Sequence, residues 1–498
     1  MKNKNTTIFL FVAVLIIFAV GSAAIYVEMR TNAGMDNTDR ALACEDCNVI
    51  IVSLTNTRKD HIGTYGYERN TTPNIDAFFK NSLIFNNAFT HASWTLPSAV
   101  SFFTSLYPFA HGVMQRDKVQ YIPENVTTFT ELLKEGGYAT AAFTGDGDYS
   151  RMFGTDRGFD VYADRESYGD LDIQIDETDI VSIKSYVSAA SLLPAAGKWL
   201  MQNRKKKFFL FVQGFETHCP FTPSGQFEEM FDSGYEGDVD FSRCLWTFER
   251  VEPKIKGGEK FWPVRTWFEP GKGPLDVLLS ERDVEKMISL YDGEIAQADD
   301  ALAEFFADIE AFGLEKNTII IFMSEHGDLF GENGRFMRGG PLRGTFYDPV
   351  INFPLMIRHP NVKEPIVVDD LVQMVDLAPT LLSILGMDDV DKGVRQGKKL
   401  GLSVFGDKET NEYVYAGSRY VSDNVFFKGT STVESIRGKK WKLIKETIAL
   451  KGETKEYYEL YDIKNDPGES EDVYGTEKDI SLFLKERLRL WSEEILIR

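Results

Sequence analysis

The sequence predicts an α/β protein with a large, doubly wound, mostly parallel β-sheet and a small carboxy-terminal antiparallel α+β subdomain. First, Asn48–Leu54 is a continuous apolar run, which is typical of a strand buried on both faces of a parallel sheet. Second, further short apolar runs alternate with helical stretches, as in doubly wound sheets. Third, beyond about residue 405 the pattern changes to short strand-like runs followed by one amphipathic helix.

Each expected element follows from a local pattern. Pro73 stands at the start of a helix expected over 73–80, where its missing N–H costs nothing. Gly136 and Gly137 end a helix expected over 128–135. Further helices are expected over 97–107, 281–312, 370–385 and 480–495. Further strands are expected over 138–143, 208–212, 318–323 and 354–357, and in the subdomain over 413–420, 441–446 and 457–462.

Length and charge narrow the classes of partner. The chain has 498 residues, enough for one large domain with an appendage. Its formal net charge is -21, which excludes nucleic acid as a partner because phosphate binding requires clustered Lys and Arg. The same charge argues against adsorption to an anionic membrane surface. The 43% hydrophobic and 26% charged residues indicate an ordinary globular protein.

The amino-terminal segment predicts a location outside the cytoplasm. Lys2 and Lys4 precede the uncharged run Ile8–Val27, which is long enough to span a bilayer and is oriented with its amino terminus inside. A cleavable signal peptide is the alternative, since Ser22-Ala23-Ala24 offers small residues for cleavage. The protein is therefore expected to be membrane-anchored through this segment only, or secreted if it is cleaved.

These observations divide the chain into four parts. Residues 1–30 are the anchor or signal peptide, and the polar residues 31–46 are a stalk. Residues 47–404 form the main domain, and residues 405–498 form the carboxy-terminal subdomain.

Four cysteines fit an oxidising compartment. Cys44 and Cys47 could close a small loop, and Cys219 and Cys244 another, although connectivity cannot be derived from sequence alone. A zinc site at Cys44 and Cys47 is a weaker alternative, because no second Cys or His pair accompanies them.

Polar clusters stand at expected strand ends and at one helix start. In doubly wound sheets the functional site lies at the carboxyl ends of the strands. The clusters are Thr55–His61, Ser93–Ser98, Glu216–Pro220 and Ser324–Asp328.

The residues around these clusters resemble the sulfatase family of the alkaline-phosphatase superfamily. The resemblance rests on segments in the family's order, spread over nearly the whole ordered chain. They are Asp60–Tyr67 with Thr71–Asp76, Trp94–Ser98 with Phe103–Pro108 and His111-Gly112, Tyr291–Ile295 leading to Ser324–Gly327, and Leu460–Glu469.

The resemblance implies a site that binds a divalent cation and an anionic ester. Thr95 would stand at the nucleophile position, and His218 and Arg343 would contact the ester oxygens. The cation would be Ca²⁺ first, with Mg²⁺, Mn²⁺ or Zn²⁺ as alternatives. Its expected ligands are Thr55, Asn56, Glu325 and His326.

Several of these positions depart from the family pattern. Thr55 and Asn56 replace Asp, so two ligands lack charge and the cation affinity should fall. Glu325 replaces Asp, which keeps the charge on a longer side chain. Thr95 replaces the Cys or Ser that matures to formylglycine. Ala99 replaces a basic residue close to the nucleophile. A stabilising cation is therefore missing there, unless one of three arginines supplies it: Arg58, Arg338 or Arg343.

Each site residue also has a structural alternative. Thr95 could be only the N-cap of its helix. Glu325 and His326 could be an ordinary strand-end pair, and His218 could be a structural loop residue. His61 and His111 are expected to hold loops and are left out of the site. The acidic residues of 146–164 lack metal-loop spacing and are expected to be solvated surface.

Three functions follow from the resemblance and its departures. The first is hydrolysis of a sulfate ester on a small molecule or a glycan. The second is a phosphodiesterase or phosphotransferase that uses Thr95 directly, as related enzymes of the superfamily do. The third is a catalytically inactive binding protein on a sulfatase scaffold, because charge has been lost at Asn56 and Ala99.

Overall fold

The structure is a computed structural model that describes residues 41–115, 120–164, 167, 187–247, 250–266, 275–338, 345–388, 393–406, 411–423 and 428–497. The expected anchor or signal peptide at 1–30 and residues 31–40 of the expected stalk lie outside the described residues. Within the described part of the chain, no helix is both long and apolar enough to cross a bilayer. The end of the expected stalk packs on the domain, because Leu42 is buried and the Cys44 N–H donates to the Ile384 carbonyl.

One sheet organises the main domain, with β1 in its middle. β1 pairs in parallel with β11 and β6, and the parallel run continues through β4 to β5, whereas β14 is antiparallel to β11 and β2. The predicted doubly wound, mostly parallel sheet is confirmed. The strand order is β15 (Ile366–Val368), β2 (Leu83–Phe85), β14 (Leu355–Arg358), β11 (Thr318–Met323), β1 (Asn48–Leu54), β6 (Phe208–Gly214), β4 (Ala139–Thr144) and β5 (Val161–Ala163).

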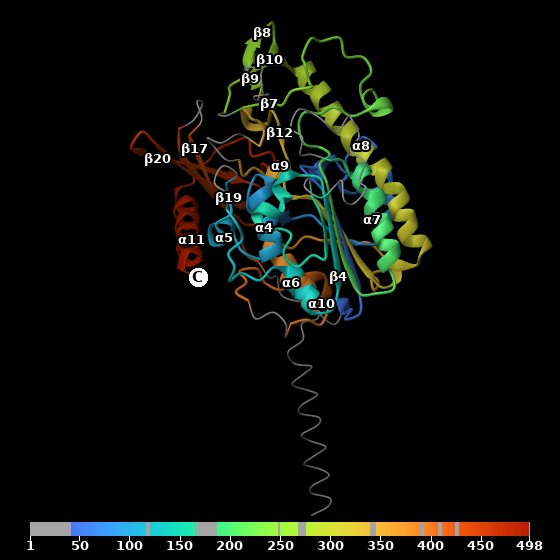
Figure 1. Ribbon diagram of the computed structural model, residues 1–498. Helices are drawn as coiled ribbons and strands as arrows, with labels where there is room; N and C mark the ends of the chain where they lie inside the picture. The colour runs from blue at the N-terminus through green and yellow to red at the C-terminus, as the bar shows by residue number, and fades with distance from the viewer. Residues whose placement is uncertain are drawn as a thin grey trace, which may run out of the picture.

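Helices cover both faces of this sheet (Figure 1). Val49 and Ile51 of β1 pack into the core on one face, and Ile50 and Val52 pack into the core on the other, because successive side chains of a strand point to opposite faces. Burial on both faces explains the apolar run 49–52 of β1. The first face carries α4 (Thr95–Thr104), α6 (Phe129–Glu135) and α10 (Leu377–Ile384), and the second carries α3 (Pro73–Phe78), α7 (Ala189–Asn203) and α8 (Glu281–Ala311).

Two helix boundaries differ from the prediction for local reasons. α4 begins at Thr95 instead of Pro97, which is possible because Pro in the first helical turn removes no intrahelical hydrogen bond. α10 covers only the second half of the helix expected over 370–385. The first half includes β16 (Val372–Gln373), which pairs with β3 (Ala88–Phe89).

Smaller elements complete the main domain. They are α5 (Pro108–His111), α9 (Asp348–Ile351), the pair β12 (Leu329–Phe330) and β13 (Phe336–Met337), and a separate sheet of β7 (Leu245–Trp246), β8 (Lys254–Lys256), β9 (Glu259–Thr266) and β10 (Asp276–Ser280).

Both cysteine pairs considered from the sequence form disulfides. Cys44 bonds to Cys47 directly before β1, and Cys219 bonds to Cys244, which ties the loop after β6 to the segment before β7. The described cysteines leave none free for a zinc site.

The carboxy-terminal part is an antiparallel sheet with one helix, as predicted. α11 (Lys478–Ile497) packs on the sheet through Leu484, Leu488 and Trp491. β18 was not predicted, because its segment is rich in Gly, Ser and Thr and lacks an apolar run. The strand order is β17 (Val414–Asp423), β18 (Lys428–Arg437), β19 (Trp441–Leu450) and β20 (Glu453–Asp462).

A buried ionic cluster joins this subdomain to the main domain. The Lys442 side chain has no exposed surface, and its Nζ lies 2.9 Å from Oδ1 of Asp348 and 2.6 Å from Oε1 of Glu469. Arg437 adds a contact of 3.1 Å to Asp348 and stacks on Phe89. Because these charges are removed from water, each depends on its partners for compensation.

Replacing Lys442 by Met should therefore lower the free energy of unfolding by about 3–5 kcal/mol, since two carboxylates would lose their buried partner. Urea unfolding measures this value. Lys440→Met is the matched control: this lysine is half exposed and 3.6 Å from Asp462, and such pairs contribute about 1 kcal/mol or less. Equal losses in the two variants would contradict the structural role of the cluster.

Candidate active site at the carboxyl ends of the strands

Polar side chains gather where the central parallel strands end. The register pairs Ser53 with Met323 on one side and with Gln213 on the other, and it pairs Gln213 with Thr144. The residues after these strands therefore lie along one edge of the sheet, where such folds place their sites. Four of the predicted site residues, each at most 1% exposed, follow β1 and β11 there: Thr55, Asn56, Glu325 and His326.

Thr95 reaches the same edge from the start of α4. Its Oγ1 lies 3.3 Å from Nε2 of His326, and both side chains are fully buried. The N-cap residue of α4 is Trp94, so the alternative in which Thr95 merely caps the helix is wrong. The helix start and the end of β11, which are distant in sequence, thus meet at one hydrogen bond.

The surroundings of His326 determine which of its two ring nitrogens carries the hydrogen. Nδ1 lies 3.0 Å from the Gly327 carbonyl oxygen, which can only accept. Nδ1 therefore carries the hydrogen of the neutral ring, and Nε2 accepts from the Thr95 hydroxyl. Gly327 is required here, because an added Cβ would lie 2.2 Å from the carbonyl oxygen of Pro349.

Glu325 is buried among polar groups from the neighbouring strands. Its Oε2 accepts a hydrogen bond of 3.2 Å from Ser53, and Thr55 beside it accepts one from Gln213. Burial, together with the negative charge of Asp146, raises the pKa of Glu325 to about 7. A carboxylate in this environment remains ionised at neutral pH only when positive charge compensates it.

A second chain of contacts connects Asn56 to His218. Nδ2 of Asn56 donates to Asp328 Oδ2 at 2.7 Å, and Nε of Arg338 lies 3.9 Å from Oδ1 of the same carboxylate. Arg338 also donates to Nε2 of His218, whose Nδ1 donates to the Cys219 carbonyl oxygen at 2.7 Å. The chain fixes a guanidinium group next to the strand-end cluster.

The three arginines considered as substitutes for a cation at Ala99 have different positions. Arg338 is 8% exposed and lies within the chain just described. Arg58 is engaged by Asp60 at 2.7 Å and by Glu332 at 2.6 Å, so it holds loops together. Arg343, predicted to contact substrate, lies outside the described residues. Ala99 itself packs in the apolar core beneath α4.

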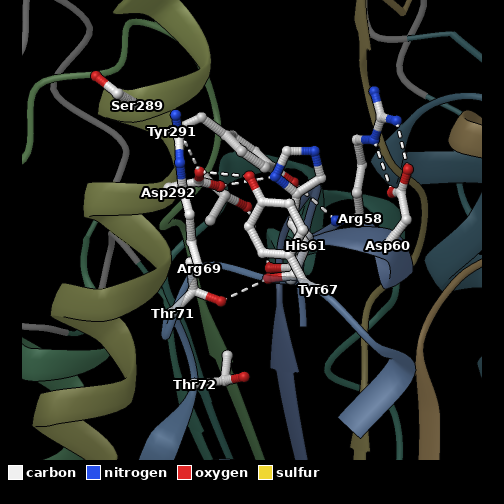
Figure 2. A network of polar contacts seen from close by, with 12 residues as sticks. Arg58, Asp60, His61, Tyr67, Arg69, Thr71, Thr72, Ser289, Tyr291 and Asp292 are labelled. Atoms are coloured by element: carbon white, nitrogen blue, oxygen red, sulfur yellow. Dashed lines mark hydrogen bonds and ion pairs between the residues drawn. The ribbon is translucent and has the colours of Figure 1, made fainter. Parts of the chain in front are cut away.

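Helix α8 holds the loop after β1 in place (Figure 2). The Tyr291 hydroxyl accepts from the Arg58 N–H at 2.7 Å and donates to the Asn56 carbonyl oxygen at 2.8 Å. Asn56 has a φ of 64°, in the left-handed region that Asn tolerates better than most residues. Tyr291 therefore secures the unusual backbone that directs Asn56 into the site.

The next residue on α8, Asp292, is fully buried and receives three hydrogen bonds, which Figure 2 shows. Its partners are Nδ1 of His61 at 2.7 Å, Oη of Tyr67 at 2.6 Å and Nη1 of Arg69 at 2.7 Å. His61 thus holds a loop, as predicted. His111 does the same, because its Nδ1 accepts from the Val113 N–H and its Nε2 contacts Ser101 of α4.

The expectation that the acidic residues of 146–164 form solvated surface is wrong for three of them. Asp146, Asp148 and Asp164 are at most 4% exposed. Asp164 pairs with Arg151 at 2.9 Å. The backbone N–H of Asp146 donates to Oε1 of Gln213 at 3.0 Å, which places Asp146 at the end of β4 on the same edge as the site.

The donor atoms at this edge fit a hard cation. In the described residues, Oδ1 of Asn56, Oε1 of Glu325 and Oδ1 of Asp328 are buried oxygens that receive no hydrogen bond. An uncompensated buried oxygen is costly, and a hard cation would satisfy it. The same part of the chain contains no group of three His, Cys, Asp or Glu that could hold a metal, so amide and hydroxyl oxygens would have to complete the ligand set.

The large mixed sheet, the polar strand ends and the small antiparallel subdomain define an alkaline-phosphatase-like fold. The structure is similar to that of a phosphonate monoester hydrolase of Agrobacterium radiobacter, with a TM-score of 0.66 and 18% identity over 90% of this chain and 96% of that one. It is also similar to a 2-O GAG sulfatase, with a TM-score of 0.64 and 19% identity over 90% of this chain and 92% of that one.

Sequence comparison identifies the family. The model described as Sulfatase matches residues 47–387, and the model described as N-sulphoglucosamine sulphohydrolase, C-terminal, matches residues 342–494. The chain belongs to the sulfatase family. Curated relatives include a Delta 4,5-hexuronate-2-O-sulfatase of Bacteroides thetaiotaomicron, 22% identical over 90% of this chain and 89% of the relative, and the mouse Arylsulfatase K, 22% identical over 84% and 74%.

The structure adds residues that the sequence analysis did not assign. Asp328 links Asn56 to Arg338, and Gln213 links Thr55 to the end of β4. Gln213 directly follows a predicted strand, and Asp328 is the last residue of a predicted strand-end cluster, so the strand-end rule contained the signal. Tyr291 lies in the middle of a helix, and nothing in the sequence indicates that its hydroxyl reaches β1.

Glu294 on α8 holds the loop that carries His218. Its carboxylate accepts from the Thr217 N–H at 3.1 Å and from the Thr222 N–H at 2.6 Å. Burial raises the pKa of Glu294 to about 8, although these two hydrogen bonds oppose the shift. The folded protein therefore binds this proton more tightly than the unfolded chain does.

This shift predicts how stability depends on pH. Between the unfolded pKa of about 4.3 and the folded value, the unfolded chain binds fewer protons, so the free energy of unfolding falls as the pH rises. Glu294→Gln cannot ionise and should lose this decline, which urea unfolding at a series of pH values would detect. Glu285→Gln, on the exposed face of the same helix, is the control. Parallel curves for wild type and Glu294→Gln would contradict the assignment.

Proposed function

We propose that this protein hydrolyses sulfate esters of a glycan outside the cytoplasm, with Thr95 as the nucleophile. The observation that carries the proposal is the contact of 3.3 Å between Oγ1 of Thr95 and Nε2 of His326 at the carboxyl edge of the sheet. It unites the two sequence positions where the sulfatase family has its nucleophile and a cation ligand.

In the proposed reaction, Oγ1 of Thr95 attacks sulfur, and the bond from sulfur to the sugar oxygen breaks. The proton lost from Oγ1 balances the one gained by the sugar oxygen. Water then hydrolyses the sulfated Thr95 and restores the hydroxyl. The buried position of Thr95 at a helix start places it near backbone N–H groups that favour an anion.

Thr55, Asn56, Glu325 and His326 would hold the divalent cation, and the unpaired oxygens of Asn56 and Glu325 support this assignment. His326 would bind through Nε2, whose lone pair accepts from Thr95 in this structure, so the cation would replace that hydrogen bond. When bound, a divalent cation polarises ester oxygens and stabilises the charge of the transition state. Ca²⁺ suits a set made mainly of oxygen ligands, with Mg²⁺, Mn²⁺ and Zn²⁺ as alternatives.

Arg338 is assigned to bind the remaining ester oxygens, together with the predicted Arg343. Two contacts support the choice of Arg338, because both Asp328 and His218 hold its guanidinium group in place. His218 would then act mainly by holding Arg338, since its Nε2 accepts from that arginine.

The glycan substrate is proposed from the relatives. Those similar to this chain include the Delta 4,5-hexuronate-2-O-sulfatase, an Ulvan-active sulfatase of Formosa agariphila and an Endo-4-O-sulfatase of Bacteroides thetaiotaomicron. A location outside the membrane, reached through the segment 1–30, would give access to such polymers and is part of the proposal.

The direct test is Thr95→Ala against a panel of aryl sulfates, aryl phosphates and sulfated oligosaccharides with added divalent cation. The variant should lose about 10³-fold or more in kcat, because removal of a nucleophile abolishes the covalent step. Thr104→Ala, in the same helix but away from His326, should keep its activity. Equal rates in Thr95→Ala and wild type would exclude Thr95 as the nucleophile.

The same panel tests the second candidate, a phosphodiesterase or phosphotransferase. That candidate is favoured by Thr95 itself, a hydroxyl that can attack phosphorus without maturation. It predicts faster turnover of the phosphates than of the sulfates, together with an acid-stable phosphate adduct on Thr95 in the mass spectrum.

Removal of one ligand charge should weaken cation binding. Glu325→Gln should lower the affinity for Ca²⁺ or Mn²⁺ by about tenfold or more, since affinity follows the charge of the ligand set. Isothermal titration calorimetry measures the affinity, with the exposed Glu310→Gln as control. If the wild type bound no cation at all, the third possibility, a catalytically inactive binding protein, would be favoured.

A further inference from the structure

Arg338, which the proposed function assigns to the ester oxygens, keeps an unused donor within the described part of the chain. Its guanidinium group donates to Nε2 of His218, whereas its buried Nε lies 3.9 Å from Oδ1 of Asp328 and donates no hydrogen bond. A buried N–H group without an acceptor is costly, and an oxygen of a bound anion would satisfy it. The orientation of this guanidinium group therefore matters for any anion that enters the site.

A third side chain contacts the same guanidinium group, namely the indole of Trp246 in β7. Cζ of Arg338 lies over this ring at 5.3 Å from its centroid, within the range of a cation–π contact. Indole is the best aromatic partner for a cation, and the planar guanidinium group of arginine stacks on such faces. The contact with Trp246 therefore restricts the orientations that Arg338 can adopt.

A disulfide connects the two segments that carry the ring partners of Arg338. Cys219 directly follows His218, Cys244 lies two residues before Trp246, and the two cysteines are bonded to each other. The bond limits how far the imidazole and the indole can move apart, because the Cα atoms of a disulfide stay within about 7 Å of each other.

A hydrogen bond attaches β7 to β13, the strand that Arg338 directly follows. Oγ1 of the buried Thr247 accepts from the Phe336 N–H of β13 at 2.9 Å. On its other side, β7 pairs with β9, where Trp246 is the cross-strand partner of Arg265. The indole and the guanidinium group are therefore held by two strands that are fixed to one another.

We propose that Trp246 is a positioning residue that orients the Arg338 guanidinium group toward a tetrahedral oxyanion in the candidate site. This inference rests on the proposed function, in which Arg338 binds the ester oxygens. It adds the small sheet β7–β10 to the parts of the chain that determine anion affinity. Trp246 acts through Arg338 in this role and needs no contact with the ester itself.

The test is binding of inorganic sulfate to the full chain, measured by isothermal titration calorimetry with Ca²⁺ present, and of inorganic phosphate in a parallel series. Trp246→Leu should weaken the affinity for either anion by about three- to tenfold, because the guanidinium group loses its stacking partner. Trp246→Phe keeps an aromatic face and should restore most of the affinity. Unchanged affinity in Trp246→Leu would overturn the proposal.

Trp262→Leu is the matched control. Trp262 stands in β9 of the same sheet and packs on Phe336 of β13, with 6.1 Å between the ring centroids. Its removal disturbs the packing of the sheet on β13 but leaves the indole on Arg338, so the sulfate affinity should equal that of wild type. Equal losses in Trp262→Leu and Trp246→Leu would attribute the effect to packing and overturn the proposal.

A double-mutant cycle tests whether Trp246 acts through Arg338. In an Arg338→Ala background, Trp246→Leu should cause no further loss of sulfate affinity, because the group that it positions is absent. A further loss as large as that in the wild-type background would mean that Trp246 acts independently of Arg338, and the inference would fail.

The same variants separate this inference from the proposed function. Anion binding requires no turnover, so an inactive protein that loses sulfate affinity in both Trp246→Leu and Arg338→Ala would support the inference and contradict the proposed hydrolysis. A loss in Arg338→Ala alone would overturn only the inference. Wild-type affinity in Arg338→Ala, or no anion binding by wild type, would overturn both the inference and the proposed role of Arg338.

A second replacement keeps the test decisive if Trp246→Leu does not fold. A fluorinated tryptophan at position 246 alone retains the shape of the ring but withdraws electron density from its face, which weakens a cation–π contact. A fall in sulfate affinity with increasing fluorination would support the proposal, and constant affinity would overturn it.

Discussion

The hydrogen bond between Asn56 and Asp328 joins the ends of the two central strands, and the arrangement of the site depends on it. Its 2.7 Å contact lies in a region where both residues are at most 1% exposed, so neither side chain can turn to water instead. A buried amide or carboxylate without a partner costs a few kcal/mol. The hydrogen bond between these buried polar side chains therefore holds the strand ends together. The Tyr291 hydroxyl also fixes the backbone of Asn56, because it donates to the Asn56 carbonyl oxygen.

The same constraint explains how the site can differ from the family pattern without losing its shape. Asn56 stands where a charged residue is expected, yet it keeps an acceptor oxygen directed into the cluster while its amide nitrogen binds Asp328. In the proposed function, Arg338, which directly follows β13 and contacts Asp328, would supply the positive charge that Ala99 lacks. In this proposal, positive charge comes from a neighbouring segment instead of from the motif itself. The site could therefore keep its chemistry although the motif residues are replaced.

Much of this arrangement could be predicted from the sequence, and the remainder could not for physical reasons. β1 and β11 are mainly apolar because both faces of the sheet are covered, and the residues that follow these parallel strands had to share one edge. β18 escaped prediction because its Gly, Ser and Thr residues carry no apolar pattern. Asp146 is buried although a solvated position was expected, because it contacts Gln213 on another strand. No local sequence pattern indicates such a contact.

Contacts with residues 335–338 and 345–348 give the carboxy-terminal subdomain a role beyond covering the domain. Arg338 lies in the candidate site, whereas Arg335 and Tyr347 pack toward β19 and β20. Directly after Tyr347, Asp348 is fixed by the buried Lys442 of the subdomain. Because buried ion pairs tolerate little displacement, the ionic cluster holds the carboxy-terminal sheet in a constant position against Asp348 of the main domain.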